Sequence, residues 1–449
     1  MESRFAASFS GLATIGRVAS LSGAPVSLVA PEAPPATDKK FSEPRYIVLL
    51  ALLLGSQPVA TDLYLPALPA IAAELGNPAL TLTGLMLVFG FAQLILGPLS
   101  DRLGRRPVLL AGCTAYALTS FAGAWVTTLY GLVICRCLQG AAMAALIVCA
   151  RASVRDLYSP VDGTRILSRG LSGLGLVALA SPLVGALMIV YFSWHATFIA
   201  TGIFALAAGV WVWLYYQESR PTPTAIPATS PNSTNALTTN ATTDVANATF
   251  TVLKGPRFRA WTAMLAASYG MLFCFLLSSG FVYITVFGFS PLACGLVLAG
   301  NSVAYIAGTY FCRRLLRRAG PDQAVRASAA FGVVGAVLML AVAFALGPQP
   351  WAMIVGQYLL AYAHGVNQPC GQAGAIGDFP EHAGRAAALS GFIMMFTAFA
   401  CGQLMAPSLG SSAWPLVISN ALGAAAIAFV AWVAVPRAYA ASTEWAKRT

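Results

Sequence analysis

Charged residues are scarce in this chain. They make up 9% of its 449 residues, whereas a typical soluble protein carries about 25%. The hydrophobic fraction is 58% and the mean hydropathy is +0.74, so most of the surface has to face something other than water. The apolar runs are continuous over about 20 residues, which is the length of a membrane-spanning helix, and they lack the alternation of barrel strands. A soluble globular protein is therefore excluded.

Enzyme motifs are also missing. The chain has no His-Glu-x-x-His for zinc, no Gly-x-Ser-x-Gly for an acyl nucleophile and no Gly-x-x-x-x-Gly-Lys-Ser/Thr loop for nucleotide hydrolysis. An intramembrane aspartyl protease would need a second aspartate at the depth of Asp378, and no span supplies one. The nine cysteines fall within or at the ends of apolar runs, where we expect packing rather than disulfides or metal ligation. We therefore expect no enzyme activity, no metal and no cofactor. Any uphill transport then has to use an ion gradient.

Twelve apolar spans predict an all-α membrane protein with twelve transmembrane helices. A Pro-, Thr-, Asn- and Ser-rich segment, typical of a flexible linker, divides them six and six. We expect the spans at about 46–72, 80–99, 107–126, 129–150, 168–191, 196–216, 261–287, 292–312, 324–346, 351–376, 386–408 and 413–434. The predicted organisation is a disordered cytoplasmic tail at 1–44, a six-helix half at 45–218, a flexible cytoplasmic linker at 219–256, a six-helix half at 257–436 and a cytoplasmic tail at 437–449.

The distribution of charge is more informative than its sum. A net charge of +11 could indicate a nucleic-acid-binding protein. With the N-terminus in the cytoplasm, however, every Lys and Arg except Arg136 falls on the cytoplasmic side, and the opposite side receives none. This positive-inside pattern predicts that both termini are cytoplasmic and that the number of spans is even. It also makes the lipid bilayer, and not nucleic acid, the expected partner.

One basic turn is repeated. The segment Gly97-Pro-Leu-Ser-Asp-Arg-Leu-Gly-Arg-Arg-Pro107 lies between spans 2 and 3, and Asp101 and Arg105 form an i,i+4 pair if the helix continues that far. After span 8 comes Cys312-Arg-Arg-Leu-Leu-Arg-Arg-Ala-Gly-Pro321, which keeps the paired basic residues but has lost the aspartate. The repeat predicts two related halves that rock against each other around a midplane site, as in secondary transporters.

Two strongly ionisable residues lie well inside spans, Asp62 in the first and Arg136 in the fourth. Each costs about 2.5–3.5 kcal/mol at the bilayer centre on insertion scales, so such residues are functional candidates by default. Their depths from the basic flanks agree, at about 25 Å and about 22 Å for a rise of 1.5 Å per residue. They could therefore meet if spans 1 and 4 are neighbours. The alternative is a buried ion pair that merely locks two helices.

Prolines predict a broken helix next to Asp62. Pro66 cannot donate to the carbonyl of Asp62, and Pro69 cannot donate to that of Leu65. Free carbonyls beside a cavity are typical of transporter binding sites. If a proton is carried, Asp62 is the best carrier. Alternation between an apolar surrounding and the neighbourhood of Arg136 would let this carboxyl bind and release the proton as the protein rocks.

Four segments together resemble the Bcr/CflA drug-resistance branch of the major facilitator superfamily. They are Asp62-Leu-Tyr-Leu-Pro-Ala-Leu-Pro69, the 97–107 turn, Arg136-Cys-Leu-Gln-Gly140 and Phe281-Val-Tyr-Ile-Thr-Val-Phe-Gly288. The resemblance spans about residues 45–435. It implies a twelve-helix proton antiporter that expels drugs or small metabolites across the bacterial inner membrane. It also implies that Asp101, Arg102 and Arg105 form a cytoplasmic charge network that stabilises one gate.

Aromatic and amide side chains in the spans suit a small amphipathic substrate in a largely apolar cavity. Gln139 and Met143 share the helix face of Arg136. His364 is a reserve candidate for carrying a proton, although a packing histidine is the commoner case. We expect the substrate cavity to be lined by Tyr64, Gln139, Met143, Tyr283, Asn301, Tyr305, Tyr358 and Tyr362.

Several functional readings stay open at this stage. The leading one is a monomeric, proton-coupled exporter of drugs or small amphipathic compounds. A close alternative is a specific exporter or importer of one metabolite, such as a nucleoside. A non-transporting membrane sensor would usually add a soluble signalling domain, for which the tail and the linker are too poor in hydrophobic patterning. The substrate's charge is open as well, because Asp62 would favour cations and Arg136 anions.

Overall fold

The computed structural model describes residues 42–219 and 249–445, and every regular element in this part of the chain is helical. The expected N-terminal tail up to residue 41 and most of the expected linker, 220–248, lie outside the described residues.

In the first half of the chain, the first membrane span is an interrupted helix, and five long helices follow it. In chain order these are α1 (Glu43–Thr61), the 3₁₀ turn η1 (Leu65–Ala67), α2 (Leu68–Leu75), α3 (Ala79–Leu103), α4 (Arg105–Trp125), α5 (Leu129–Leu157), α6 (Pro160–Tyr191) and α7 (Trp194–Tyr215).

The second half repeats this organisation and runs past residue 436, where we expected it to end. Its elements are α9 (Pro256–Gly280), the π-helix η2 (Phe281–Val286), α10 (Pro291–Leu346), α11 (Pro350–Ile376), η3 (Pro380–His382), α12 (Ala383–Met405), η4 (Ala406–Ser408), α13 (Trp414–Phe429), the π-helix η5 (Val430–Ala434) and α14 (Val435–Trp445).

Ten helical segments of the described residues are long and apolar enough to span a membrane. One of them, α10, has 56 residues, about 84 Å at 1.5 Å per residue, and it is interrupted at Gly320, whose φ is 78°. It therefore makes two passes. A further helix, α11, has 27 residues and is less apolar because it carries Gln357, His364 and Asn367. The described residues thus form the twelve membrane helices that the sequence predicts.

Helix starts follow local sequence signals. The side chains of Thr128, Ser159 and Ser290 accept hydrogen bonds from backbone N–H groups in the first turns of α5, α6 and α10. Proline occupies the first turn of α6, α9, α10 and α11, where its missing N–H leaves no bond unmade. These caps fix where each helix begins at the membrane surface.

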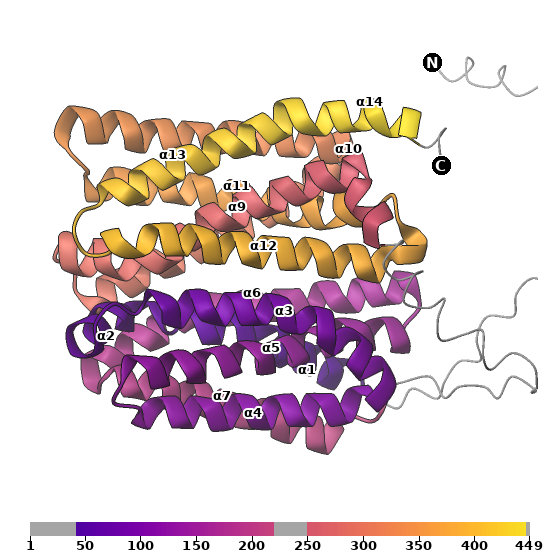
Figure 1. The fold of residues 1–449 in the computed structure, drawn as a ribbon, viewed down its shortest axis with the longest axis horizontal. Helices are drawn as coiled ribbons and strands as arrows, with labels where there is room; N and C mark the ends of the chain where they lie inside the picture. The colour runs from indigo at the N-terminus through magenta and orange to yellow at the C-terminus, as the bar shows by residue number, and fades with distance from the viewer. Residues whose placement is uncertain (1–41, 220–248, 446–449) are drawn as a thin grey trace, which may run out of the picture. The chain divides into compact units, whose positions relative to one another are not determined.

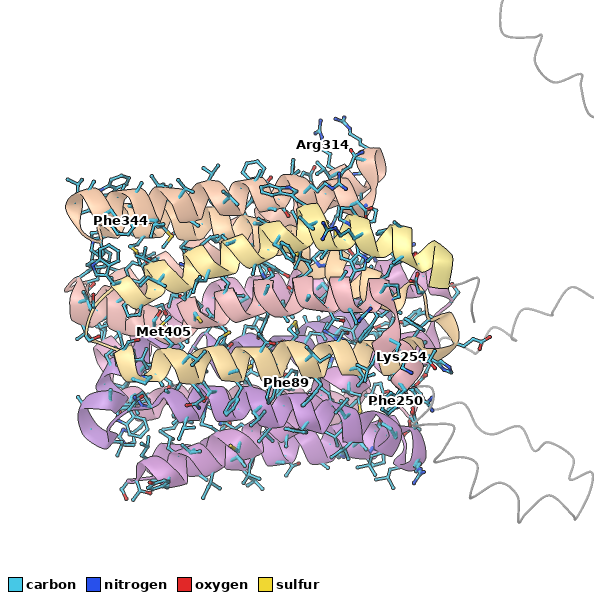
Figure 2. All side chains as sticks on the ribbon, turned by 45° about the horizontal axis from the view of Figure 1, so that its top comes forward. Phe89, Phe250, Lys254, Arg314, Phe344 and Met405 are labelled. Carbon is cyan, nitrogen blue, oxygen red and sulfur yellow. The ribbon has the colours of Figure 1, made fainter. Side chains whose placement is uncertain are left out.

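The basic turns gather at one end of the helices. Figure 2 shows Lys254 and Arg314 near one end, and Phe344 and Met405 near the other. We name the end that carries the turns at Gly104 and Gly320 the basic end, and the other the opposite end. Large apolar side chains stay exposed on the helix flanks between the two ends; Ile95 of α3 is 66% exposed and Ile203 of α7 is 58% exposed. Such exposure suits contact with lipid.

The two halves meet along two pairs of helices. The second long helix of the first half, α3, packs against α12, and α6 packs against α10 (Figure 1). The break in the first span, η1, also packs against α9. Both seams pair the second membrane helix of one half with the fifth of the other, which is what two-fold-related repeats require.

Candidate functional site

The first span breaks at Asp62, as its prolines predict. The helix α1 ends at Thr61, and the chain continues in 3₁₀-type bonds from Tyr64 N to Thr61 O (3.1 Å) and from Leu65 N to Asp62 O (3.4 Å). The Asp62 side chain is partly buried. Its Oδ1 lies 2.7 Å from the hydroxyl of Thr61, which is its one hydrogen bond to a described residue. A carboxylate with so few donors is poorly stabilised as an anion.

The break rests against glycines of both halves. A Cβ at Gly185 of α6 would lie inside the van der Waals distance of the Leu63 carbonyl oxygen. A Cβ at Gly280 of α9 would lie 2.6 Å from the carbonyl oxygen of Leu65. Only residues without a side chain permit this approach. Asp62 is therefore held where the first half touches the second.

A group of polar side chains, which we name the interface cluster, lies beside the break. Gln57 of α1 donates from Nε2 to Tyr269 Oη of α9 at 3.0 Å. On its other side, Tyr269 faces the imidazole of His364, with ring centroids 6.2 Å apart. The cluster thus joins residues of both halves.

His364 completes this cluster from α11. Its Nδ1 lies 2.8 Å from Ser268 Oγ, and its ring centroid lies 5.7 Å from that of Tyr305. Tyr305 in turn donates to Oε1 of Gln368 at 2.8 Å. The His364 side chain is 3% exposed and has no carboxylate partner within the described residues. This arrangement favours a neutral imidazole that packs and donates or accepts one hydrogen bond.

Arg136 lies in a different place from Asp62, and no ion pair joins them in the described residues. Arg136 is 1% exposed; its Nε donates to the Thr81 carbonyl (3.3 Å) and its Nη1 to Gln139 Oε1 (2.9 Å). The Tyr64 ring centroid is 4.4 Å from its guanidinium carbon. Helices α1 and α5 are neighbours, as a meeting of the two residues would require. Depth does not fix how each helix is rotated, and α5 turns Arg136 towards α3.

Two of the expected cavity residues, Tyr64 and Gln139, contact Arg136 inside the first half, and a third, Met143, is buried on the same helix α5. The Tyr64 hydroxyl is 2.8 Å from Thr81 Oγ1, and Gln139 donates from Nε2 to Ser120 Oγ at 2.9 Å. Tyr64 is 2% exposed, and Gln139 and Met143 are fully buried.

The expected cavity residues of the second half are dispersed. Tyr305 is in the interface cluster. Asn301 accepts from Gln357 at 3.4 Å within the second half, and Tyr283 is fully buried beside Phe287 and Phe289.

Tyr358 and Tyr362 line a separate pocket between α10 and α11. This pocket of about 270 Å³ is apolar, and its other lining residues include Phe331 and Val355, which are 38% and 46% exposed. The Tyr358 hydroxyl donates to the carbonyl of Val297 at 3.1 Å, so it is not directed towards Asp62. A substrate role for this tyrosine pair stays a prediction.

The 97–107 turn forms a charge network at the basic end. Arg105 donates to Asp101 in the expected i,i+4 pair, and its Nε donates to Asp156 Oδ2 of α5 at 3.0 Å. Glu218, which follows α7, accepts from the backbone N–H groups of Arg105 (2.8 Å) and Arg106 (3.0 Å) at the start of α4. A carboxylate there is stabilised by the helix dipole.

Four participants in these contacts were not among the residues singled out from the sequence. Gln57 and Tyr269 are polar residues in apolar spans, which is a weak signal because such residues also serve helix packing. Asp156 is an acid at the end of a span that is otherwise flanked by arginines, and Glu218 is the first acid after span 6. Arg102 is exposed at the same turn.

Comparison with known proteins decides the family. The sequence model of the Major Facilitator Superfamily matches residues 50–402, which is most of the chain. The chain belongs to the Major Facilitator Superfamily. The two-half arrangement of twelve helices agrees with that membership.

Among curated proteins, relatives with resistance names match nearly the full chain. A chloramphenicol resistance protein of Pseudomonas aeruginosa is 28% identical over 406 residues, covering 85% of this chain and 90% of the relative. A bicyclomycin resistance protein homolog of Haemophilus influenzae is 26% identical, with 83% and 92% covered. Multidrug resistance protein D of Escherichia coli is 26% identical, with 77% and 84% covered.

These findings confirm the resemblance to the drug-resistance branch that the four sequence segments indicated. The chain is a transporter of this superfamily and a multi-pass membrane protein, and its family membership confirms that it is not an enzyme.

Proposed function

We propose that this protein is a proton-coupled antiporter that exports drugs or small amphipathic compounds across the bacterial inner membrane by alternating access. The observation that carries the proposal is the position of Asp62. This carboxyl sits at a break in the first span, is partly buried, and lies where α9 of the second half touches the first half. Relatives named for chloramphenicol, bicyclomycin and multidrug resistance support drugs as the cargo.

Asp62 is the proton carrier in this proposal. A carboxylate with one hydroxyl donor is unfavourable in an apolar site, so closure of the halves around an empty site favours its protonated form. A substrate that binds next to Asp62 offers the carboxylate dipoles or a positive charge and permits the proton to leave. Exchange of proton for substrate at one group is the requirement for antiport.

Arg136 takes a supporting role in the same scheme. Its contacts with Tyr64 and Thr81 fix the chain on both sides of the loop that follows the break. It therefore positions the segment that carries Asp62 and is not its counter-ion in this conformation. The substrate cavity is then expected beside the interface cluster, to which Tyr305 belongs among the expected cavity residues.

The basic end faces the cytoplasm in this proposal, because the basic loops gather there and positive loops stay inside. The network of Asp101, Arg105 and Asp156 ties α3 to α4 and α5 within the first half. It keeps the half rigid while the basic end opens and closes, and Arg102 at the same turn extends it.

The test is uptake of chloramphenicol into liposomes that contain the purified protein and have an acidic lumen. Chloramphenicol is uncharged, so a pH gradient alone does not concentrate it. We expect wild-type protein to accumulate it above its external concentration, and a proton ionophore to abolish the accumulation. We expect Asp62→Asn to lose gradient-driven accumulation while it retains downhill movement.

The control is Glu381→Gln, which neutralises an exposed carboxylate at the basic end and should accumulate chloramphenicol like the wild type. Accumulation by the wild type that ignores the gradient would remove antiport. Accumulation by Asp62→Asn at the wild-type level would remove Asp62 as the coupling group.

A further inference from the structure

One hydrogen bond crosses between the halves next to Asp62. We name it the latch: Gln57 Nε2 of α1 donates to Tyr269 Oη of α9 at 3.0 Å. The backbone carbonyl of Gln57 lies 3.0 Å from Thr61 Oγ1, and the same hydroxyl lies 2.7 Å from Asp62 Oδ1. The latch is therefore one helical turn away from the proposed proton site and connected to it through Thr61.

The Tyr269 hydroxyl lacks a good acceptor for its own hydrogen in this arrangement. It accepts the hydrogen bond from Gln57, and its own hydrogen points to Met86 Sδ at 3.9 Å. A thioether is a weak acceptor, so the phenol holds a strong donor that is almost unused. Tyr269 is 6% exposed, which makes an unused donor unfavourable unless another acceptor is present for part of the transport cycle.

The latch also occupies the place where a substrate has to fit. In alternating access the substrate binds between the halves near the midplane, and Gln57 and Tyr269 meet across that boundary. A molecule that enters beside Asp62 has to separate these two side chains. Its polar group then competes directly with the Gln57 amide for the phenol.

We propose that the latch is an internal substitute for substrate. Tyr269 positions the substrate by donating its O–H to an uncharged acceptor such as a carbonyl, amide or nitro oxygen, and Gln57 holds Tyr269 when the site is empty. This inference rests on the proposed function and adds the chemical class of the recognised group. It makes Gln57 an intramolecular competitor of the substrate.

The two partners of one hydrogen bond should therefore affect binding in opposite directions. In Gln57→Leu the competitor is absent, so chloramphenicol binds more tightly. In Tyr269→Phe the ring still packs against His364 but the donor is gone, so binding weakens. The double variant should resemble Tyr269→Phe, because Gln57 then has nothing to compete for. Each effect should be about two- to tenfold in Kd, the range of one neutral hydrogen bond.

The experiment is equilibrium binding of chloramphenicol to the full-length protein in detergent, by titration calorimetry without any gradient. Gln403→Leu is the matched control: Gln403 Nε2 donates to Thr83 Oγ1 at 2.8 Å, another bond between side chains of the two halves. Its loss loosens the halves without freeing Tyr269, so its Kd should stay at the wild-type value. Gln57→Asn, whose amide is too short to reach the phenol, replaces the Leu variant if the latter is not recovered folded.

Several results would overturn the inference. They are a shift of both single variants in the same direction, an unchanged Kd in Tyr269→Phe, or a decrease in Gln403→Leu equal to that in Gln57→Leu. The absence of chloramphenicol binding by the wild type would overturn it too. These binding measurements need no proton gradient. Opposite shifts of Kd in the two single variants would therefore support the latch even if transport by Asp62→Asn proved to be fully coupled to the gradient.

Discussion

At the scale of single residues, Arg136 illustrates how a cation is accommodated in a helix bundle without a carboxylate partner. Its guanidinium stacks 4.4 Å above the Tyr64 ring centroid and donates to one backbone carbonyl and one amide oxygen. The planar, weakly hydrated guanidinium suits this kind of contact, whereas an ammonium does not.

This geometry predicts that Arg136 acts mainly through stability. Arg136→Ala removes the hydrogen bond to the Thr81 carbonyl and leaves the Gln139 amide oxygen without its buried partner, which should lower the free energy of unfolding by about 1–3 kcal/mol. Arg136→Lys should not restore it, because lysine lacks the planar fork. The measurement is thermal unfolding of the purified variants in detergent, with Arg313→Ala, an exposed arginine of the basic end, as control.

If Arg136→Ala melted at the wild-type temperature, or if Arg136→Lys recovered that temperature fully, the buried contacts would contribute little to the stability. In that case the arginine would have to act through charge alone, and pairing with Asp62 in another conformation would be the better account.

Residue-level contacts were only partly predictable from the sequence. The face that Arg136 shares with Gln139 follows from helical spacing, and the structure joins these two residues. The pair Asp101 and Arg105 is equally local. The partners Thr81, Asp156 and Tyr269 come from other helices, and their choice depends on helix rotation and packing, which leave no signal in one sequence.

At the scale of elements, the break of the first span is the feature that organises the site. Pro66 and Pro69 predict this break, because each removes a backbone donor that a continuous helix would need. The structure adds what the sequence could not predict, namely that Gly185 of α6 and Gly280 of α9 receive the exposed carbonyl groups. The break thus becomes a contact between the halves.

Gly185→Ala tests this contact. The added methyl would collide with the Leu63 carbonyl oxygen, and because that atom belongs to the backbone, α6 has to move away. We expect destabilisation of about 1–3 kcal/mol, typical of overpacking, and a loss of chloramphenicol uptake. Gly384→Ala in the first turn of α12 is the control, because a Cβ there meets nothing within 4 Å and should not lower the stability.

Equal unfolding temperatures and equal uptake rates for the two alanine variants would contradict this account of the break. Lower stability with unchanged uptake would assign the contact to folding alone.

At the scale of the whole molecule, the contacts within each half differ in kind from those that cross between the halves. The ion pairs of the described residues all join elements of the same half, such as Arg105 with Asp156 and Arg257 with Asp378. Hydrogen bonds that cross between the halves include the latch and the bond from Asn77 Nδ2 to the Ala406 carbonyl (2.9 Å) at the opposite end. Opening the basic end by rocking would therefore break none of these ion pairs.

Twelve passes, two halves and one basic end were predictable because hydropathy, the linker and the charge of loops are properties of long segments. The seams were not, because one sequence does not mark which helix face of α3 meets α12 or which face of α6 meets α10. The helix α11 was predicted as a span even though it carries Gln357, His364 and Asn367, and the charge of the loops supports it because a missing span would break the positive-inside alternation.

The central claim is that substrate and proton exclude each other at Asp62. The most direct measurement is the proton release when chloramphenicol is added to purified protein in weakly buffered detergent solution, followed with a pH indicator. The account predicts release by the wild type and none by Asp62→Asn at saturating chloramphenicol. Release of the same size by Asp62→Asn, or none by a wild type that binds chloramphenicol, would contradict it.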